Sequence, residues 1–469
     1  MSLNSYVALR RYGFGPKPGQ AETLARPRDW LEKQLVPAAS RAHGLSDTAL
    51  RLDSSRERID RLMEARRMTG KKKMAAIEEF KKTLFREAAA RMMRAAHSEA
   101  PFYERLVWFW SNHFTVAISA GGLMGLAGSF EREAIRPNIL GKFEDLLLAS
   151  TKHPAMLVYL DQAGSVGPNS ITGNRQDKGI NENLAREILE LHTVSVHGGY
   201  DIKDIQALAK MLTGWSVAND RYAQYADDKH ATREGFAYYP INHEPGEKRL
   251  LGKRYQDLDG YKEADQALRD LARRRDTARF VCTKLARHFG GDYPPGPLVK
   301  ELIESYMNTG GELRPLYRIL IRSEEVWKRP IIKYLQPLEL IVSTFRALAD
   351  YDHWPEGRDA LARLGKKEAF GMITSADLLG QFPFDAKSPQ GWADIAEAWR
   401  APEATVVRAE WAYEAGLRTA RRMKDNPGAL GEGLLGPLLD PPTRQAMERA
   451  ESRGEAIALM LASPAFQHR

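Results

Sequence analysis

The sequence predicts a mainly α-helical protein, a large irregular array of many helices with a small β-hairpin insertion. Apolar residues recur at helical spacing through most of the 469 residues, and Pro or Gly marks many of the boundaries. Helical periodicity vanishes only between Ser216 and Tyr261, where Phe236, Tyr238 and Ile241 alternate with other residues as they would in a strand.

The first half of the chain is predicted to contain one central helix. A short opening helix ends in the Gly/Pro turn at residues 13–16, and helical spacing resumes at 29–35. Pro101 then begins a helix at the position where a missing N–H costs nothing. Its aromatic residues from Tyr103 to Trp110 make it apolar almost all round, so we expect it to lie in the core.

The stretch 181–193 is the densest mixture of helix-forming, charged and amide residues in the chain. At about 100° per residue, Leu184, Ile188 and Leu191 fall on one side of a helix. A long polar loop, residues 162–180, leads into this helix and is interpreted as a lid over it. The opposite face of the helix carries Asn183, Arg186, Glu187 and Glu190.

The second half of the chain is again predicted to be helical. Asp201 is expected to N-cap a helix over 202–212, which stops at Thr213-Gly214-Trp215. In the insertion, Pro245-Gly246 fits a type II turn, and 249–255 is expected to be the strand that returns from it. Further helices are expected at 277–289, 297–306, 313–327 and 334–349.

Three parts describe the predicted organisation. An N-terminal helical part, residues 1–215, carries the polar helix, and residues 216–262 form the loop and hairpin insertion. A C-terminal helical part covers 263–469. The three parts are expected to form one continuous structural unit.

Composition excludes several function classes. The net charge is +8, but its densest region, 51–94, alternates bases with apolar residues, which predicts two amphipathic helices with basic outer faces. Without a zinc-finger or aromatic RNA-binding signature, nucleic acid is disfavoured as a partner. The glycine-rich stretch 121–128 lacks the spacing of a phosphate-binding loop. A single cysteine, Cys282, excludes an internal disulfide and any Cys-rich metal site.

The apolar runs of the sequence are far too short to cross a bilayer, which predicts a soluble protein. Residues 1–6 have no basic region followed by an apolar core, so no signal peptide is seen. These observations favour a cytoplasmic location, with the periplasm as the alternative.

The polar face of 181–193 supports a catalytic hypothesis. Glu187 and Glu190 lie one turn apart, so mutual repulsion could raise one pKa and divide them into a general acid and a base or nucleophile. Arg186 would hold an anionic group and Asn183 would orient it. The competing interpretation is structural, in which ion pairs such as Arg186 with Glu190 tie neighbouring helices together.

Other polar residues are candidates for binding. On the central aromatic helix, Arg105 and Asn112 share a face with His113 beside them, and buried polar groups must find partners. None of the histidines forms a local metal-binding motif, so no metal ligand is assigned and the cofactor is unknown. The remaining binding candidates are His192, Trp215, His243 and Lys248.

Several blocks along the sequence carry a resemblance to a known family: residues 9–16, 108–114, 153–157, 159–161, 181–187, 190–193, 212–215, 243–252, 278–285 and 380–381. The pattern is similar to the bacterial domain-of-unknown-function family numbered 1800 and covers nearly the whole chain. Many members carry an export signal that this sequence lacks, and Gln390-Gly391-Trp392 stands where Asp-Gly-Tyr is usual. Because the family is uncharacterised, the resemblance implies no activity.

Three functions follow as alternatives. The first is a hydrolase-like enzyme with the paired glutamates, Arg186 and Asn183 in a pocket between helices, acting on a small-molecule or polymer substrate. The second is a non-catalytic helical binding or assembly partner of another protein. The third is a metal-binding protein using His and carboxylate ligands. The enzymatic alternative predicts an open pocket lined by Glu187, Glu190, Asn112 and His243.

Overall fold

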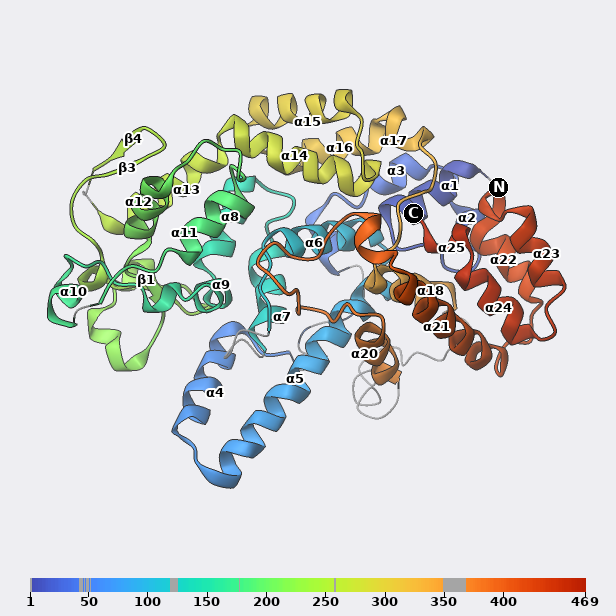
Figure 1. Cartoon of the computed structure of the whole chain (residues 1–469), viewed down its shortest axis with the longest axis horizontal. Helices are drawn as coiled ribbons and strands as arrows, with labels where there is room; N and C mark the ends of the chain where they lie inside the picture. Colours follow the sequence, from blue (N-terminus) through green and yellow to red (C-terminus); the bar gives the residue numbers. More distant parts are fainter. Residues whose placement is uncertain are drawn as a thin grey trace.

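The computed structural model describes residues 2–41, 45, 47, 50, 52–118, 125–176, 178–256, 259–348 and 368–469. Helices dominate this part of the chain, and its strands form two small antiparallel two-stranded sheets (Figure 1). The predicted fold class, mainly α with a small hairpin, is therefore confirmed. Residues 121–124 of the glycine-rich stretch lie outside the described residues.

The N-terminal helices pack against the C-terminal ones, on the right of Figure 1. Arg10 Nη2 donates a 2.6 Å hydrogen bond to the carbonyl of Phe466, and the Tyr6 hydroxyl donates to the carbonyl of Gly433 at 3.2 Å. The N-terminal elements are α1 (Leu3–Val7), η1 (Ala8–Tyr12), α2 (Gln20–Thr23), α3 (Pro27–Glu32) and η2 (Pro37–Arg41).

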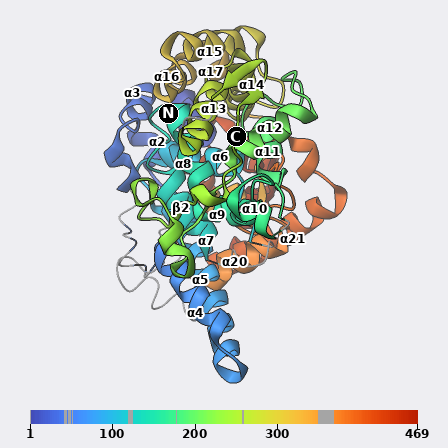
Figure 2. The same cartoon turned by 90° about the vertical axis from the view of Figure 1, so that its left-hand side faces the viewer.

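Helices α4 (Ser55–Arg67) and α5 (Gly70–His97) form a hairpin that projects from the body (Figures 1 and 2). Ser54 begins α4 with a capping box to Glu57. The lysines at 71–73 and 81–82 are exposed, whereas the last third of α5 is buried in the body. The two basic amphipathic helices predicted for this region are confirmed.

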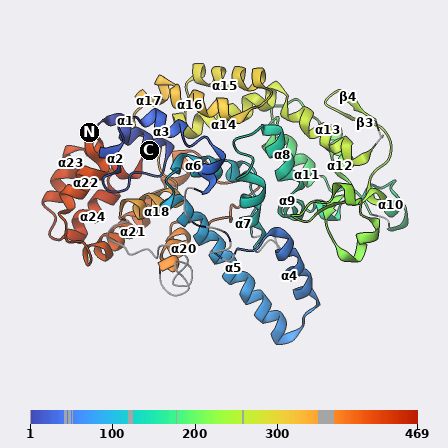
Figure 3. The ribbon, with the colours of Figure 1, turned by 180° about the vertical axis from the view of Figure 1, so that it is seen from behind.

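Helix α6 (Pro101–His113) lies near the middle of the molecule, next to α14 (Figure 3). Pro101 occupies its first turn, and Leu106 and Trp110 are fully buried, as the aromatic sequence predicts. The elements that follow it are α7 (Leu126–Phe130), η3 (Glu131–Ile135), α8 (Phe143–Lys152), α9 (Pro154–Tyr159), η4 (Gln162–Gly164) and α10 (Ile171–Gln176).

The polar helix exists, but it changes its winding halfway. It runs as an α-helix, α11 (Asn183–Glu187), and continues as a π-helix, η5 (Ile188–His192). A π turn holds an extra residue, so it rotates the side chains after Glu187 away from the uniform 100° spacing. Such turns are rare and occur frequently at functional sites.

The segment 162–180, predicted to be a lid over the polar helix, packs against the insertion. The amide of Gly167 donates to the carbonyl of Asn242 at 2.9 Å, and Asn169 Nδ2 donates to Glu244 Oε1 at 2.7 Å. These contacts attach the described residues of the segment to the insertion. Since none of them lines the large cavity described below, the prediction of a lid is not supported.

The insertion contains the strands, but their pairing differs from the prediction. Strand β2 (Phe236–Tyr238) pairs with β1 (Trp215–Val217), while β3 (Lys248–Leu250) pairs with β4 (Lys253–Tyr255) across a turn at Leu251-Gly252. Both turn residues have positive φ, 47° and 82°, as a tight hairpin turn requires. The predicted pairing across Pro245-Gly246 is wrong. The remaining elements here are α12 (Ile202–Leu212), η6 (Asp220–Tyr225), η7 (Asp228–His230) and η8 (Pro240–Asn242).

The rest of the chain is helical, and the predicted helix 313–327 is broken at Ser323, whose ψ of 110° is extended. One hydrophobic cluster includes residues from all three predicted parts, such as Leu106, Leu250 and Leu461. The remaining elements are α13 (Gly260–Ala272), α14 (Arg275–Gly290), α15 (Gly296–Thr309), α16 (Leu313–Arg322), α17 (Glu324–Lys328), α18 (Pro337–Ala347), α20 (Glu368–Leu378), η9 (Ala396–Trp399), α21 (Pro402–Ala420), α22 (Pro427–Leu435), η10 (Gly436–Leu438), α23 (Pro441–Glu448), α24 (Arg453–Ala462) and α25 (Pro464–Gln467).

Candidate active site

A cavity of about 420 Å³ opens beside the carboxyl end of α6. This volume is in the range of small-molecule sites. Its walls come from α5, α6, η5 with the residues after it, α14, the start of α18, and the segment 381–394. The charged and amide side chains on the walls are Arg91, Asn112, Glu190, Lys284, Arg287, Gln336, Glu339, Gln381, Gln390 and Asp394, with imidazoles from His197 and His288.

Asn112 holds one wall in place. Its Nδ2 donates to the carbonyl of Trp392 at 2.8 Å, and its Oδ1 accepts from the Trp392 amide at 2.7 Å. Both polar atoms of the amide are thus engaged by the backbone of the segment that carries Asp394. The contacts of Asn112 in this structure are therefore structural, and they position this segment.

Gly391 lets that segment approach α6. Its φ is +79°, and a Cβ at this position would lie 2.5 Å from the carbonyl oxygen of Asn112. Gly380 has nearly the same φ, +78°, but a Cβ there would meet nothing within 4 Å. A comparison of substitutions at the two glycines therefore separates the cost of backbone strain, which both share, from the cost of close contact, which only Gly391 has.

We expect Gly391→Ala to destabilise the protein by about 1–3 kcal/mol more than Gly380→Ala, because only the former adds overpacking to the strain of positive φ. Urea unfolding of the two variants and the wild type measures the difference. Equal destabilisation would show that the segment 390–394 can move away from α6 at no cost.

Two buried histidines stand behind Lys284. His113 Nε2 lies 3.1 Å from the carbonyl of His192, so this nitrogen carries the proton and donates. His113 Nδ1 is then free to accept from Lys284 Nζ at 3.1 Å. Burial keeps both rings neutral: it lowers the pKa of His113 well below its ordinary value and that of His192 to about 3. His113 therefore positions the lysine, and the carbonyl of His192 orients the His113 ring.

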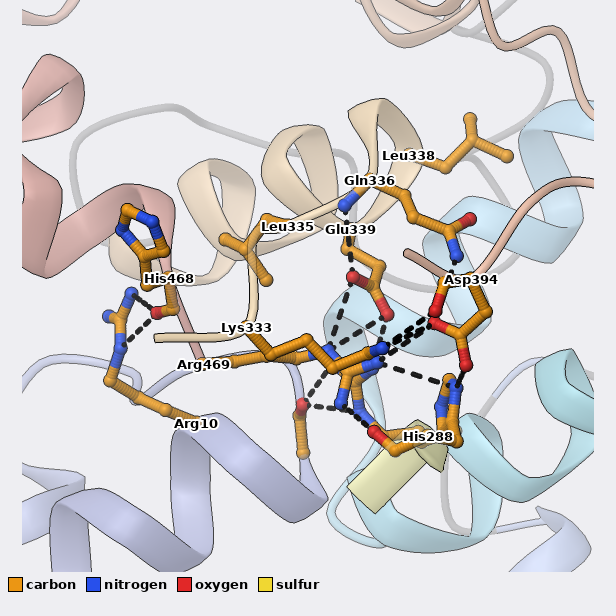
Figure 4. Close-up of polar contacts among 12 residues, drawn as sticks. Arg10, His288, Lys333, Leu335, Gln336, Leu338, Glu339, Asp394, His468 and Arg469 are labelled. Atoms are coloured by element: carbon orange, nitrogen blue, oxygen red, sulfur yellow. Dashed lines mark hydrogen bonds and ion pairs between the residues drawn. The ribbon is translucent and has the colours of Figure 1, made fainter. Parts of the chain in front are cut away.

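His288 and Asp394 form a dyad on the cavity wall (Figure 4). His288 Nδ1 is 2.9 Å from Asp394 Oδ2. Although burial opposes ionisation, the charge of Lys333 and the hydrogen bond with His288 hold the pKa of Asp394 well below its ordinary value. An ionised carboxylate only accepts, so His288 Nδ1 carries the proton. Burial lowers the pKa of His288 to about 4, and its Nε2 has no hydrogen-bond partner among the described residues.

A network of ion pairs lies behind the dyad and neutralises the carboxylates of Asp394 and Glu339 (Figure 4). Lys333 Nζ lies 3.1 Å from Asp394 Oδ1, and Arg469 Nη1 donates to the carbonyl of His288 at 2.6 Å. Glu339 bonds Arg105 directly and lies 3.3 Å from Arg469. Burial would raise the pKa of Glu339, but the charges of Arg469 and Arg105 outweigh it and lower that pKa to about 2.

The polar helix sends only one of its two glutamates to the cavity. Glu190 lies on the cavity wall, and Glu187 does not. The pKa of Glu187 is raised, by burial first and by the charge of Glu190 second, which is the repulsion that the sequence suggests. Arg186 lies 3.3 Å from Glu182 and 3.6 Å from Glu190, and Asn183 is exposed.

Three predicted binding residues belong to another place. Trp215 is fully buried in β1 and stacks on Tyr261. Lys248 Nζ lies 2.8 Å from Glu263 Oε2, with His243 Nε2 at 3.4 Å from the same oxygen. None of these three residues lines the cavity. Four residues are predicted to line one pocket, Glu187, Glu190, Asn112 and His243, and only Glu190 and Asn112 do so.

The residues that sequence reasoning missed are Lys284, Arg287, His288 and Asp394. The first three are spaced i, i+3 and i+4 on α14, which places them on one helix face. That spacing is the only local signal, and it is equally typical of a solvated basic face. Their burial around one cavity depends on α6 and on the segment 381–394, which are both distant from α14 in the sequence.

The fold and the site together define a helical protein with a partly enclosed polar cavity. The sequence pattern of the family "protein of unknown function (DUF1800)" matches residues 7–468, so the chain belongs to that family. No curated protein and no solved structure matches the chain.

Two further properties bear on the alternatives. Among the described residues, no group of three or more His, Cys, Asp or Glu side chains is arranged to hold a metal ion. Within the same part of the chain, no helix is both long and apolar enough to cross a membrane.

Proposed function

We propose that the cavity is the active site of a hydrolase-like enzyme, with His288 as its general base. The supporting observation is the His288–Asp394 dyad, a neutral imidazole whose Nδ1 is held by an ionised carboxylate and whose Nε2 is buried without a hydrogen-bond partner among the described residues. A carboxylate-oriented imidazole of this kind removes a proton from water or from a hydroxyl in many hydrolytic enzymes. The cavity around it is large enough for a small substrate or for one unit of a polymer.

Glu190 is the second proton-transfer group of the proposal. It reaches the cavity from the π turn and bonds to the Tyr200 hydroxyl, and burial together with this contact raises the pKa of Tyr200 to about 12. Arg186, at 3.6 Å, orients the Glu190 carboxylate. Hydrolysis needs one group to accept a proton from the nucleophile and another to donate one to the leaving group. His288 and Glu190 supply these two roles.

The test is a hydrolysis screen with chromogenic esters, phosphate esters and glycosides. The wild type should hydrolyse at least one class, and Glu190→Gln should lower kcat/KM by about 10²-fold or more. Glu187→Gln is the matched control, because this residue lies one turn away on the same helix but outside the cavity. It should change kcat/KM by less than about tenfold.

If Glu190→Gln retains wild-type kcat/KM, Glu190 is not a proton-transfer group. If the wild type hydrolyses none of the substrate classes, this result contradicts the hydrolase proposal and favours the alternative of a helical binding partner. Circular dichroism of each variant confirms that the fold is intact.

A further inference from the structure

We propose that the substrate carries an anionic group, a carboxylate or a phosphate, which binds between Lys284 and Arg287 on the cavity wall. The inference rests on the proposed function in that it takes the cavity to be the place where the substrate binds. It adds the chemical class of that substrate.

The charges that line the cavity do not balance. Each carboxylate on the wall has a cationic partner outside the cavity lining: Glu339 has two arginines, Asp394 has Lys333, and Glu190 has Arg186 at 3.6 Å. Arg91 is likewise neutralised, because its Nε lies 2.7 Å from Glu131.

Lys284 and Arg287 differ from these residues. Among the described residues, neither has a carboxylate within 4 Å, and the Nε of Arg287 is buried without a hydrogen-bond partner. Each side chain is only partly exposed. Two cations that face one cavity without a carboxylate in contact make this part of the wall complementary to an anion, although the charge of Asp394 still acts on Lys284.

The surroundings of Lys284 keep its ammonium free for a ligand. Its Nζ contacts the neutral ring of His113 and lies 5.3 Å from the ring centre of Phe280. Neither neighbour cancels the positive charge, and burial lowers the pKa of Lys284 to about 8. A bound anion would remove this electrostatic cost, so binding of an anion is favoured over an empty site.

The position of the pair on α14 also suits the proposed chemistry. Lys284 and Arg287 are three residues apart, and His288 lies one turn after Lys284, so all three side chains project from one face of the helix. An anionic group held by the pair places the neighbouring bonds of the substrate close to His288. The bond to be hydrolysed is therefore expected near the anionic end of the substrate.

The experiment titrates the full chain with inorganic phosphate and, separately, with citrate as a carboxylate probe. Isothermal calorimetry at constant ionic strength, with chloride as the balancing anion, gives the dissociation constants. We expect saturable binding of at least one probe, weakened tenfold or more by Lys284→Gln and by Arg287→Gln. Binding of phosphate alone identifies a phosphate-bearing substrate, and binding of citrate alone identifies a carboxylate-bearing one.

Arg279→Gln is the matched control, because Arg279 lies on the same helix but is 66% exposed and does not line the cavity. It should leave the dissociation constants unchanged. The proposal is overturned if neither probe shows saturable binding, or if Arg279→Gln weakens binding as much as the two cavity variants do.

Lys284→Arg provides a second readout, because arginine keeps its charge at every pH tested. Lys284 faces His113 and His192 from the core and Asp394 and Arg287 from the cavity, and of these only the aspartate is charged oppositely. Wild-type affinity for the anion should therefore fall as pH rises through about 8, when the ammonium loses its proton. The affinity of Lys284→Arg for the anion should not fall over this pH range. A wild-type affinity that is independent of pH would count against Lys284 as an anion-binding residue.

The two proposals fail separately. If the anion binds but the wild type hydrolyses no substrate class, the proposed function is wrong and the anion site stands. If no anion binds but His288→Gln is inactive, the enzyme stands and its substrate is not recognised by charge.

Discussion

Replacing His288 by Gln is expected to lower kcat/KM by about 10²- to 10⁴-fold, the contribution that a positioned general base makes. The amide keeps a group able to donate to Asp394, so the ion network behind the dyad remains paired. It lacks the basic nitrogen that His288 Nε2 supplies. The loss should therefore fall on activity, with little change in the temperature of unfolding.

The pH dependence of the wild type checks the same assignment. His288 faces Asp394, Arg469 and Arg105, and with burial these groups set its pKa at about 4. A base must be unprotonated to act, so kcat/KM should rise as pH increases through about 4. His288→Gln should abolish this rise in any residual activity.

His230→Gln is the control for this prediction. His230 also has an aspartate neighbour, Asp227 at 3.8 Å, but it lies in η7 of the insertion and outside the cavity. Its replacement should leave kcat/KM unchanged. Wild-type activity in His288→Gln, with the pH profile intact, would exclude His288 as the base.

Replacing Arg105 by Met is expected to give the largest loss of stability, about 3–5 kcal/mol, because it removes one partner of a buried ion pair. Arg105 and Glu339 are 1% and 5% exposed, and Arg105 also donates to the carbonyl of Gly13 at 2.8 Å. The variant leaves Glu339 with Arg469 alone. Chemical unfolding of the variant and the wild type at neutral pH measures the difference.

The dependence of stability on pH should test the same ion pair between Arg105 and Glu339. The pKa of Glu339 in the folded protein is about 2, below its ordinary value of 4.5, so the stability contributed by the ionised carboxylate is present above pH 4.5 and is lost as pH falls towards 2. In Arg105→Met the pKa should rise, and the loss of stability should begin at a higher pH.

Arg322→Ala is the control for the ion pair. Arg322 bonds Glu32 at 2.9 Å, but it is 67% exposed, so its loss should cost only about 0–1 kcal/mol. If Arg105→Met is no more destabilising than this control, the network around Glu339 does not hold the site together.

Most of the secondary structure of this protein can be predicted from local sequence patterns. Apolar spacing and a first-turn proline predict α6, and Asp201 N-caps α12 as expected, accepting from the amide of Lys203 at 2.8 Å. These features act over a few residues, so they are legible in the sequence. The break at Ser323 and the strand partners of the insertion are not, because they depend on which surfaces pack together.

The polar helix illustrates the limit. Its existence and its buried face follow from the spacing of Leu184 and Ile188, both fully buried. The change to π winding after Glu187 shifts the hydrogen bond by one residue and leaves no mark in the pattern. Glu190, which lies in the π segment, reaches the cavity, while Glu187, which lies in the α segment, remains outside it.

The sequence by itself determined the helical class, the central aromatic helix and two of the residues on the cavity wall, Asn112 and Glu190. Only the tertiary structure decided which charges are neutralised. It pairs Glu339 and Asp394 with cations from distant segments and leaves Lys284 and Arg287 without counter-charges among the described residues. The physical reason is that helix formation depends on neighbours along the chain, whereas the state of a buried charge depends on neighbours in space.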